Sequence, residues 1–207
     1  MVITQISRRR QHLCEIVFDT GKSILLDSDY CAEKALKEGN ELRDSDIAKM
    51  QTESDYKRAV SRCLWYIERG DLSQKGLRDK LKKAGFSPAV SEKAVERMVE
   101  LGLINDEQYA LRLAENLLTV CVSKREAAVK MQQRGIPREV ALWALDEFEC
   151  DAQQQIKALI LKKYKNKLQS GEDVKKVFVA LQRKGFNYGD IKSVLKWYSE
   201  EIMYSEE

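Results

Sequence analysis

The chain has 207 residues, a formal net charge of +3 and 43% hydrophobic residues, enough to bury one large core or two small ones. Two prolines and ten glycines beside 33% charged residues favour long helices and argue against a β-sandwich or barrel, which needs many turns. The five cysteines are scattered and odd in number, and there is one histidine, which argues against a disulfide framework, a metal site or a cofactor held by such ligands.

The first 56 residues are expected to form a small α/β extension. VITQIS (2–7), LCEIVF (13–18) and SILL (23–26) are short and aliphatic, and the turn sequences RRRQH and DTGK separate them. This pattern predicts a β-hairpin and a return strand. From residue 29, YCAEKALKEG predicts a short helix that ends at Gly39, and DSDIAKMQTES predicts another brief helical or irregular piece.

The sequence DTGKS at 19–23 ends like a phosphate-binding loop. Such a loop needs a glycine five residues before the Gly-Lys pair, but Ile16 stands there and Lys22 leads into an expected strand. We therefore interpret DTGKS as a hairpin turn. Because the chain also lacks a nucleophile motif and its acidic pairs have no nearby histidine, we predict no catalytic residues and no enzymatic activity.

A pattern with a step of 50 residues follows the extension. LKKAGFS, MQQRGIP and LQRKGFN each predict the end of a helix followed by a glycine stop, at Gly85, Gly135 and Gly185. Glycine adopts the left-handed conformation that ends many helices, and the apolar residue after it can fold back onto the last turn. The equal spacing predicts a repeated structural unit.

The three copies also share helix starts and core positions. Ser73, Ser123 and Asp173 align just before a helical pattern, and each side chain is suited to cap backbone N–H groups. SKRE at 123–126 further matches a capping box between Ser123 and Glu126. In the middle helices, spacing by four residues places these pairs on the core face: Leu77 and Leu81, Ala127 and Met131, Val177 and Leu181.

A third helix is expected after each glycine. Its apolar residues are Val90, Ala94, Val95 and Met98 in the first copy, Val140, Ala144, Leu145 and Phe148 in the second, and Ile191, Val194, Leu195 and Tyr198 in the third. One such unit buries too little apolar surface alone, so we predict a mostly α, elongated tandem array. The predicted divisions are the extension 1–56 and three-helix repeats at 57–105, 106–155 and 156–207, the last with an acidic tail.

The charge is unevenly distributed along the repeats. Residues 57–100 carry +5 and residues 152–197 carry +8, whereas 1–56 and 101–151 each carry −3. Cations on several helices with an aromatic residue among them suit a polyanion, because lysines neutralise phosphates and the ring can stack on a base. The predicted nucleic-acid or partner-binding residues are Lys75, Arg78, Lys82, Lys83, Lys162, Lys163, Tyr164, Lys165, Lys167, Lys175, Lys176, Arg183 and Lys184.

Three stretches resemble the RecX family of bacterial regulatory proteins: LSQKGLRDKLKKAGFS (72–87), LGLINDEQYALRLAENLL (101–118) and IPREVALWAL (136–145). The resemblance extends over residues 57–200. It implies three tandem three-helix units that bind the RecA recombinase filament in its helical groove and limit its strand exchange, ATP hydrolysis and coprotease activity. It also implies a part in DNA repair, homologous recombination and the SOS response.

Two functional hypotheses remain open. The first is a regulator that binds the RecA filament as a monomer and contacts single- or double-stranded DNA there. The alternative is a stand-alone helical DNA- or RNA-binding module that acts through repeats 1 and 3. No segment resembles a leader sequence, and none approaches about 18 consecutive apolar residues, so either protein is expected in the cytoplasm and away from membranes.

Overall fold

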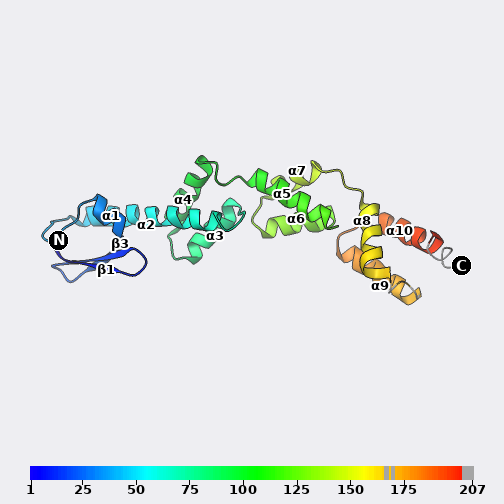
Figure 1. Ribbon diagram of the computed structural model, residues 1–207, viewed down its shortest axis with the longest axis horizontal. Helices are drawn as coiled ribbons and strands as arrows, with labels where there is room; N and C mark the ends of the chain where they lie inside the picture. Colours follow the sequence, from blue (N-terminus) through cyan, green and yellow to red (C-terminus); the bar gives the residue numbers. More distant parts are fainter. Residues whose placement is uncertain (166–167, 169–170, 202–207) are drawn as a thin grey trace. The chain divides into compact units, whose positions relative to one another are not determined.

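The computed structural model describes residues 1–165, 168 and 171–201 (Figure 1). In chain order its elements are β1 (Ile3–Arg9), β2 (Leu13–Phe18), β3 (Ser23–Asp27), α1 (Ser28–Glu33), α2 (Asp44–Ile67), α3 (Gln74–Lys83), α4 (Pro88–Glu100), α5 (Asp106–Thr119), α6 (Lys124–Gln133), α7 (Arg138–Asp146), α8 (Ala152–Leu159), the π-helical segment η1 (Ile160–Tyr164), α9 (Gly171–Arg183) and α10 (Tyr188–Glu201). The prediction of a mostly α protein with a small N-terminal sheet is confirmed. The chain divides into two units, Met1–Asn105 and Asp106–Glu207.

The N-terminal strands form an antiparallel sheet in the order β1-β2-β3. Gly21 (φ 78°) and Lys22 lie in the turn between β2 and β3, which confirms the interpretation of DTGKS as a hairpin turn. One face of the sheet packs against α1 and the first half of α2 (Figure 1). The buried side chains of this cluster include Ile16, Phe18, Leu26, Tyr30, Ile47 and Met50.

The helices after the sheet differ from the predicted ones. α1 ends at Glu33 instead of Gly39, and Ala35 then takes a left-handed φ of 49° that ends the helical path. The segment expected as a brief helical or irregular piece is the beginning of α2, which has 24 residues. The predicted boundary after residue 56 therefore falls inside a helix. Ile47 of α2 is buried in the cluster under the sheet, and Cys63 of α2 is buried in the core of the first repeat. The same helix therefore contributes residues to both hydrophobic cores.

The three glycine corners have the same backbone geometry, which confirms the predicted helix stops. The φ angles of Gly85, Gly135 and Gly185 are 92°, 86° and 85°. The residue after each glycine donates its N–H to a carbonyl of the last helical turn: Phe86 to Leu81 at 3.2 Å, Ile136 to Met131 at 3.1 Å, and Phe186 to Leu181 at 3.3 Å. These bonds satisfy carbonyl groups that the helix end would otherwise leave open.

Each repeat has its own core, and the predicted middle-helix positions are confirmed. Leu77, Leu81, Ala127, Met131, Val177 and Leu181 are all buried. The third helices α4, α7 and α10 contribute the remaining predicted residues except Phe148, and of these Val140, Leu195 and Tyr198 are only partly buried. Phe148 lies beyond the end of α7 at Asp146 and packs against the same core, partly buried. No helix in the described part of the chain is long and apolar enough to cross a bilayer.

Two of the three predicted helix caps are confirmed. Ser73 Oγ accepts the N–H of Gly76 at 3.0 Å, and Ser123 Oγ accepts that of Glu126 at 3.2 Å. The prediction for Asp173 is wrong, because α9 begins at Gly171 and therefore already includes Asp173. Its carboxylate instead forms an ion pair with Lys176, with 3.0 Å between Oδ1 and Nζ.

Candidate partner-binding surface

The predicted cations of the first repeat lie on α3. Lys75, Lys82 and Lys83 are exposed and available to a partner. Arg78 is half-buried, and its Nε lies 2.9 Å from Oε2 of Glu92, so this side chain ties α3 to α4. Arg78 thus holds the two helices together, and the three lysines contribute to the exposed positive surface of the repeat.

The predicted residues of the third repeat begin in the π-helical segment. Lys162, Lys163 and Lys165 are exposed. Tyr164 is half-buried and packs against the hydrophobic cluster of the third repeat, so its ring is partly committed to the core. Lys167 lies outside the described residues. Among the remaining predicted cations, Lys175, Lys176 and Arg183 are exposed, and Lys184 is half-buried.

The π-helical segment explains why these lysines project together. Ile160 is buried and Tyr164, four residues later, also packs on the core, while the two residues before Tyr164 are exposed lysines. A π-helix widens one turn of an α-helix and commonly occurs at functional sites. The wider turn keeps two apolar anchors inward and presents the Lys162–Lys163 pair to solvent.

Two hollows lie along α6, and one of them brings cations of the second and third repeats together. One, of about 390 Å³, is lined by Arg125 and Val129 of α6 and by Arg183, Lys184 and Gly185 at the third glycine corner. The other, of about 430 Å³, lies between α6 and α7 and shares Arg125 and Val129 with the first. Arg183 and Lys184 belong to the predicted set, whereas Arg125 does not, because the net charge of residues 101–151 is negative and concealed the cations of α6.

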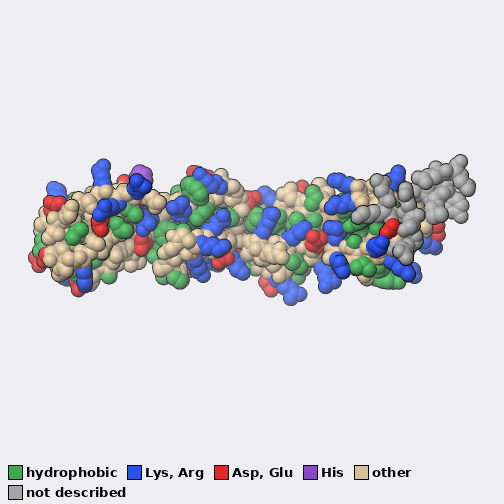
Figure 2. Space-filling view, turned by 90° about the horizontal axis from the view of Figure 1, so that it is seen from below, with side chains coloured by type: hydrophobic (Ala, Val, Ile, Leu, Met, Phe, Trp, Pro, Cys, Tyr) green, Lys and Arg blue, Asp and Glu red, His purple; other side chains and the backbone are tan. Residues whose placement is uncertain are grey.

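Exposed apolar side chains accompany these cations. Val129 on α6 and Leu142 on α7 both line the α6–α7 hollow and are both exposed. Figure 2 shows lysine and arginine side chains spread over the visible face of both units, with hydrophobic side chains between them. A surface of this mixed kind suits a protein partner as well as a phosphate backbone, because protein interfaces combine apolar centres with charged rims.

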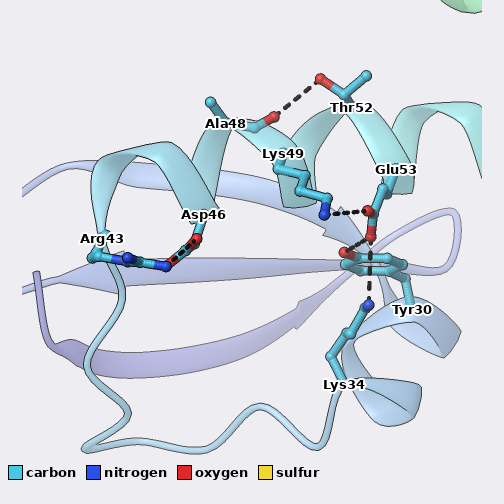
Figure 3. Close-up of polar contacts among 8 residues, drawn as sticks. All are labelled: Tyr30, Lys34, Arg43, Asp46, Ala48, Lys49, Thr52 and Glu53. Atoms are coloured by element: carbon cyan, nitrogen blue, oxygen red, sulfur yellow. Dashed lines mark hydrogen bonds and ion pairs between the residues drawn. The ribbon is translucent and has the colours of Figure 1, made fainter.

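The titratable groups with shifted pKa values lie in structural contacts. Burial and a hydrogen bond to Glu53 raise the pKa of Tyr30, and the same bond, 2.7 Å long, lowers the pKa of Glu53 (Figure 3). Burial raises the pKa of the Cys63 thiol to about 11, which disfavours a thiolate nucleophile. The described residues contain no group of three or more histidine, cysteine or acidic side chains arranged to hold a metal ion.

The fold and its surfaces define a helical repeat protein with several shallow surface hollows. A family model described as "RecX, first three-helix domain" matches residues 59–98. The regulatory protein RecX of Clostridium botulinum (strain Eklund 17B / Type B) is 26% identical over 187 residues, which cover 84% of this chain and 88% of the relative. The regulatory protein RecX of Bacillus subtilis (strain 168) is 27% identical over 200 residues, which cover 93% of this chain and 75% of the relative.

Solved structures agree with these relatives. A crystal structure of a regulatory protein RecX superposes with a TM-score of 0.67 at 23% identity, covering 94% of this chain and 98% of that one. The crystal structure of RecX from Lactobacillus salivarius gives a TM-score of 0.61 at 20% identity, covering 69% of this chain and 95% of that one. The chain is therefore similar in sequence to RecX regulatory proteins and shares their fold, and the resemblance seen in the sequence is confirmed.

Proposed function

We propose that this protein belongs to the RecX family and regulates the RecA recombinase by binding in the helical groove of its filament. The supporting observation is the three-helix unit that recurs with the same glycine corner and with exposed cations in the first and third copies. A filament presents identical subunits along its groove. A protein built from repeated units can contact several of them at once, and modest contacts then add through effective concentration.

On this proposal the protein acts by occupancy. It fills the groove where a second DNA molecule or a client protein would enter, and so limits strand exchange, ATP hydrolysis and coprotease activity. The exposed lysines of α3 and η1 supply positive charge toward bound DNA or an acidic protein surface. Because no bond is made or broken, a monomer in the cytoplasm would act in proportion to the number of filament subunits it covers.

The experiment is a titration of the protein into RecA that hydrolyses ATP on DNA. We expect hydrolysis to fall and the effect to saturate at a fixed ratio of protein to filament subunits. The variant Lys162→Gln/Lys163→Gln should require more protein for the same effect, because it removes charge from the surface without touching the core. Lys22→Gln/Lys37→Gln, which removes the same charge from exposed sites outside the predicted set, is the control. Unchanged hydrolysis at several-fold excess would refute the proposal.

A stand-alone DNA- or RNA-binding module is the second candidate, and the exposed cations of α3, η1 and α9 favour it. Binding through phosphate neutralisation weakens steeply as salt rises, because counterions are released. Titration of labelled single- and double-stranded oligonucleotides without recombinase, over a range of salt concentrations, tests it. Negligible binding at low salt would exclude this alternative and leave the RecA proposal untouched.

A further inference from the structure

A cavity of about 340 Å³ lies in the N-terminal unit, between the β1–β2 turn and α2. The turn contributes Gln11 and His12, the start of α1 contributes Asp27 and Asp29, and Phe86 closes the cavity at the first glycine corner. The rest of the wall is one face of α2, formed by Arg58, Ser61, Arg62 and Trp65. Its size lies at the lower end of the range for small-ligand sites in proteins.

The α2 wall carries an exposed tryptophan between two arginines. Trp65 is 41% exposed, and the guanidinium carbons of Arg69 and Arg62 lie 3.6 Å and 5.4 Å from the centre of its ring. Positions 58, 62 and 65 follow the helical spacing of four and three, so these side chains share one face of α2. Arg69 lies beyond the end of α2 and donates to the main-chain carbonyl of Trp65. Proteins that bind single-stranded nucleic acid combine such parts: bases stack on an aromatic ring while cations hold the backbone phosphates.

The opposite wall of the cavity is acidic. Asp27 uses Oδ1 to cap α1, accepting the N–H groups of Asp29 and Tyr30 at 3.0 Å each. Asp29 is exposed. Carboxylates repel phosphate but accept hydrogen bonds from the exocyclic amino groups of cytosine, adenine or guanine. Arg62 is exposed and forms no ion pair within the described part of the chain, so its charge is open to a phosphate.

Hydrogen bonds hold the walls in place. Ser28 donates its N–H to the carbonyl of His12 at 2.8 Å, which fastens the turn to α1. Asp27 donates its N–H to the buried Ser54 hydroxyl at 2.7 Å, which fastens α1 to α2. Lys34 and Lys49 converge on Glu53 beside the Tyr30 hydroxyl and strengthen the second contact (Figure 3). A site with fixed walls loses little conformational entropy when a ligand binds.

We propose that this cavity binds one nucleotide of a single-stranded nucleic acid. The base stacks at Trp65 with its amino edge toward Asp27 or Asp29, and the phosphate contacts Arg62. A second hollow shares Gln11, His12 and Asp29 with the cavity and continues to Arg8 and Arg9, which gives the strand a path beyond one nucleotide. The site favours bases with an exocyclic amino group over thymine and uracil. It is separate from the lysines of α3 and η1 and does not depend on the proposed RecA contact.

Fluorescence anisotropy of labelled oligo(dC) and oligo(dT) with the full chain, without recombinase, tests the proposal. We expect tighter binding to oligo(dC). Trp65→Ala should weaken oligo(dC) binding about 5- to 150-fold, the equivalent of one lost base stack. Trp143→Ala is the matched control, because Trp143 is 42% exposed on α7 and distant in sequence from the cavity. Asp29→Ala should remove the preference for oligo(dC), because it deletes the carboxylate that accepts a hydrogen bond from the amino group of cytosine. It should not weaken the binding of oligo(dT), because it also deletes a negative charge that repels phosphate.

Three outcomes would overturn the proposal. The first is equal affinity for both oligonucleotides, and the second is an equal loss for Trp65→Ala and Trp143→Ala. The third is that cytidine monophosphate displaces oligo(dC) when both are present at the same concentration of nucleotides. That result would mean that the cavity binds a free nucleotide and not a nucleotide within a strand. Oligo(rC) in a parallel arm distinguishes RNA from DNA. Circular dichroism of each variant separates loss of binding from loss of fold. Arg62→Gln, a second variant of the same wall, should also weaken oligo(dC) binding.

Discussion

The Ser123 hydroxyl donates to the main-chain carbonyl of Lys184, 61 residues later, while the same oxygen caps α6. One side chain thus joins the second repeat to the glycine corner of the third. A Cβ placed on Gly185 would lie 2.8 Å from Ser123 Oγ and 3.1 Å from Arg125 Cβ. At Gly85, in the first corner, a Cβ would meet nothing within 4 Å. Two corners with nearly the same φ therefore differ in their surroundings.

This difference predicts unequal effects of the same substitution. Gly85→Ala should lower the free energy of unfolding by about 1–2 kcal/mol, the cost of left-handed backbone for a residue with a Cβ. Gly185→Ala should cost at least about 1 kcal/mol more, because Ser123 must also move and lose its bond to Lys184. Urea unfolding of both variants measures the difference. Equal losses would show that the contact at Gly185 relaxes freely.

Ser123 should contribute more to stability than a serine that only caps a helix. Ser87 caps α4 by accepting the N–H of Val90 at 3.3 Å, and its replacement by alanine should cost about 1 kcal/mol. Ser123→Ala removes a cap and the bond to Lys184, so we expect about 2 kcal/mol. The comparison uses thermal unfolding followed by circular dichroism. A smaller loss for Ser123→Ala than for Ser87→Ala would contradict the joining role.

The core of the first repeat should be sensitive to a cavity. Leu81 is fully buried between α3 and its neighbours, so Leu81→Ala should destabilise the chain by about 2–5 kcal/mol through lost apolar contact and the void that remains. Leu101→Ala, at a side chain 49% exposed, is the control and should change stability by less than about 0.5 kcal/mol. Chemical denaturation distinguishes the two, and similar small effects would mean that Leu81 is not a core residue.

The contact between Tyr30 and Glu53 predicts a pH dependence. The hydrogen bond from Tyr30 lowers the pKa of Glu53, so the stabilisation is present above the ordinary carboxyl pKa and is lost as the pH falls through the lowered value. Burial raises the pKa of Tyr30. The stabilisation contributed by Tyr30 is therefore fully present below the ordinary tyrosine pKa and is lost as the pH rises from there through the raised value. The contact is therefore intact near neutral pH.

Urea midpoints measured at pH 7 and at about pH 4 check this dependence. We expect a smaller difference between the two midpoints in Glu53→Gln than in the unsubstituted chain, because glutamine does not titrate. Glu41→Gln, at an exposed position, should leave the difference unchanged. If Glu53→Gln kept the full acid sensitivity, another carboxylate would have to be responsible for it.

The repeated unit was predictable because its signals are local. A serine cap, a four-residue apolar spacing and a glycine stop each depend on a few neighbouring residues, and Ser73, Leu81 and Gly85 behave as predicted. The same local reasoning failed at Asp173, where the aligned position lies two residues inside the helix. The predicted boundary at residue 56, where the aligned first copy begins, lies inside α2, because an alignment of copies does not show where a helix starts.

By itself, then, the sequence determined the helical class, the three corners and the core of each repeat, because periodicity and capping are properties of short segments. Only the tertiary structure decided which surfaces form. Arg125 lines one hollow with Arg183 and Lys184 of the next repeat, and Trp65 of α2 lines another with His12 of the β1–β2 turn. Such surfaces depend on packing between segments distant in the chain, and no local pattern encodes that packing.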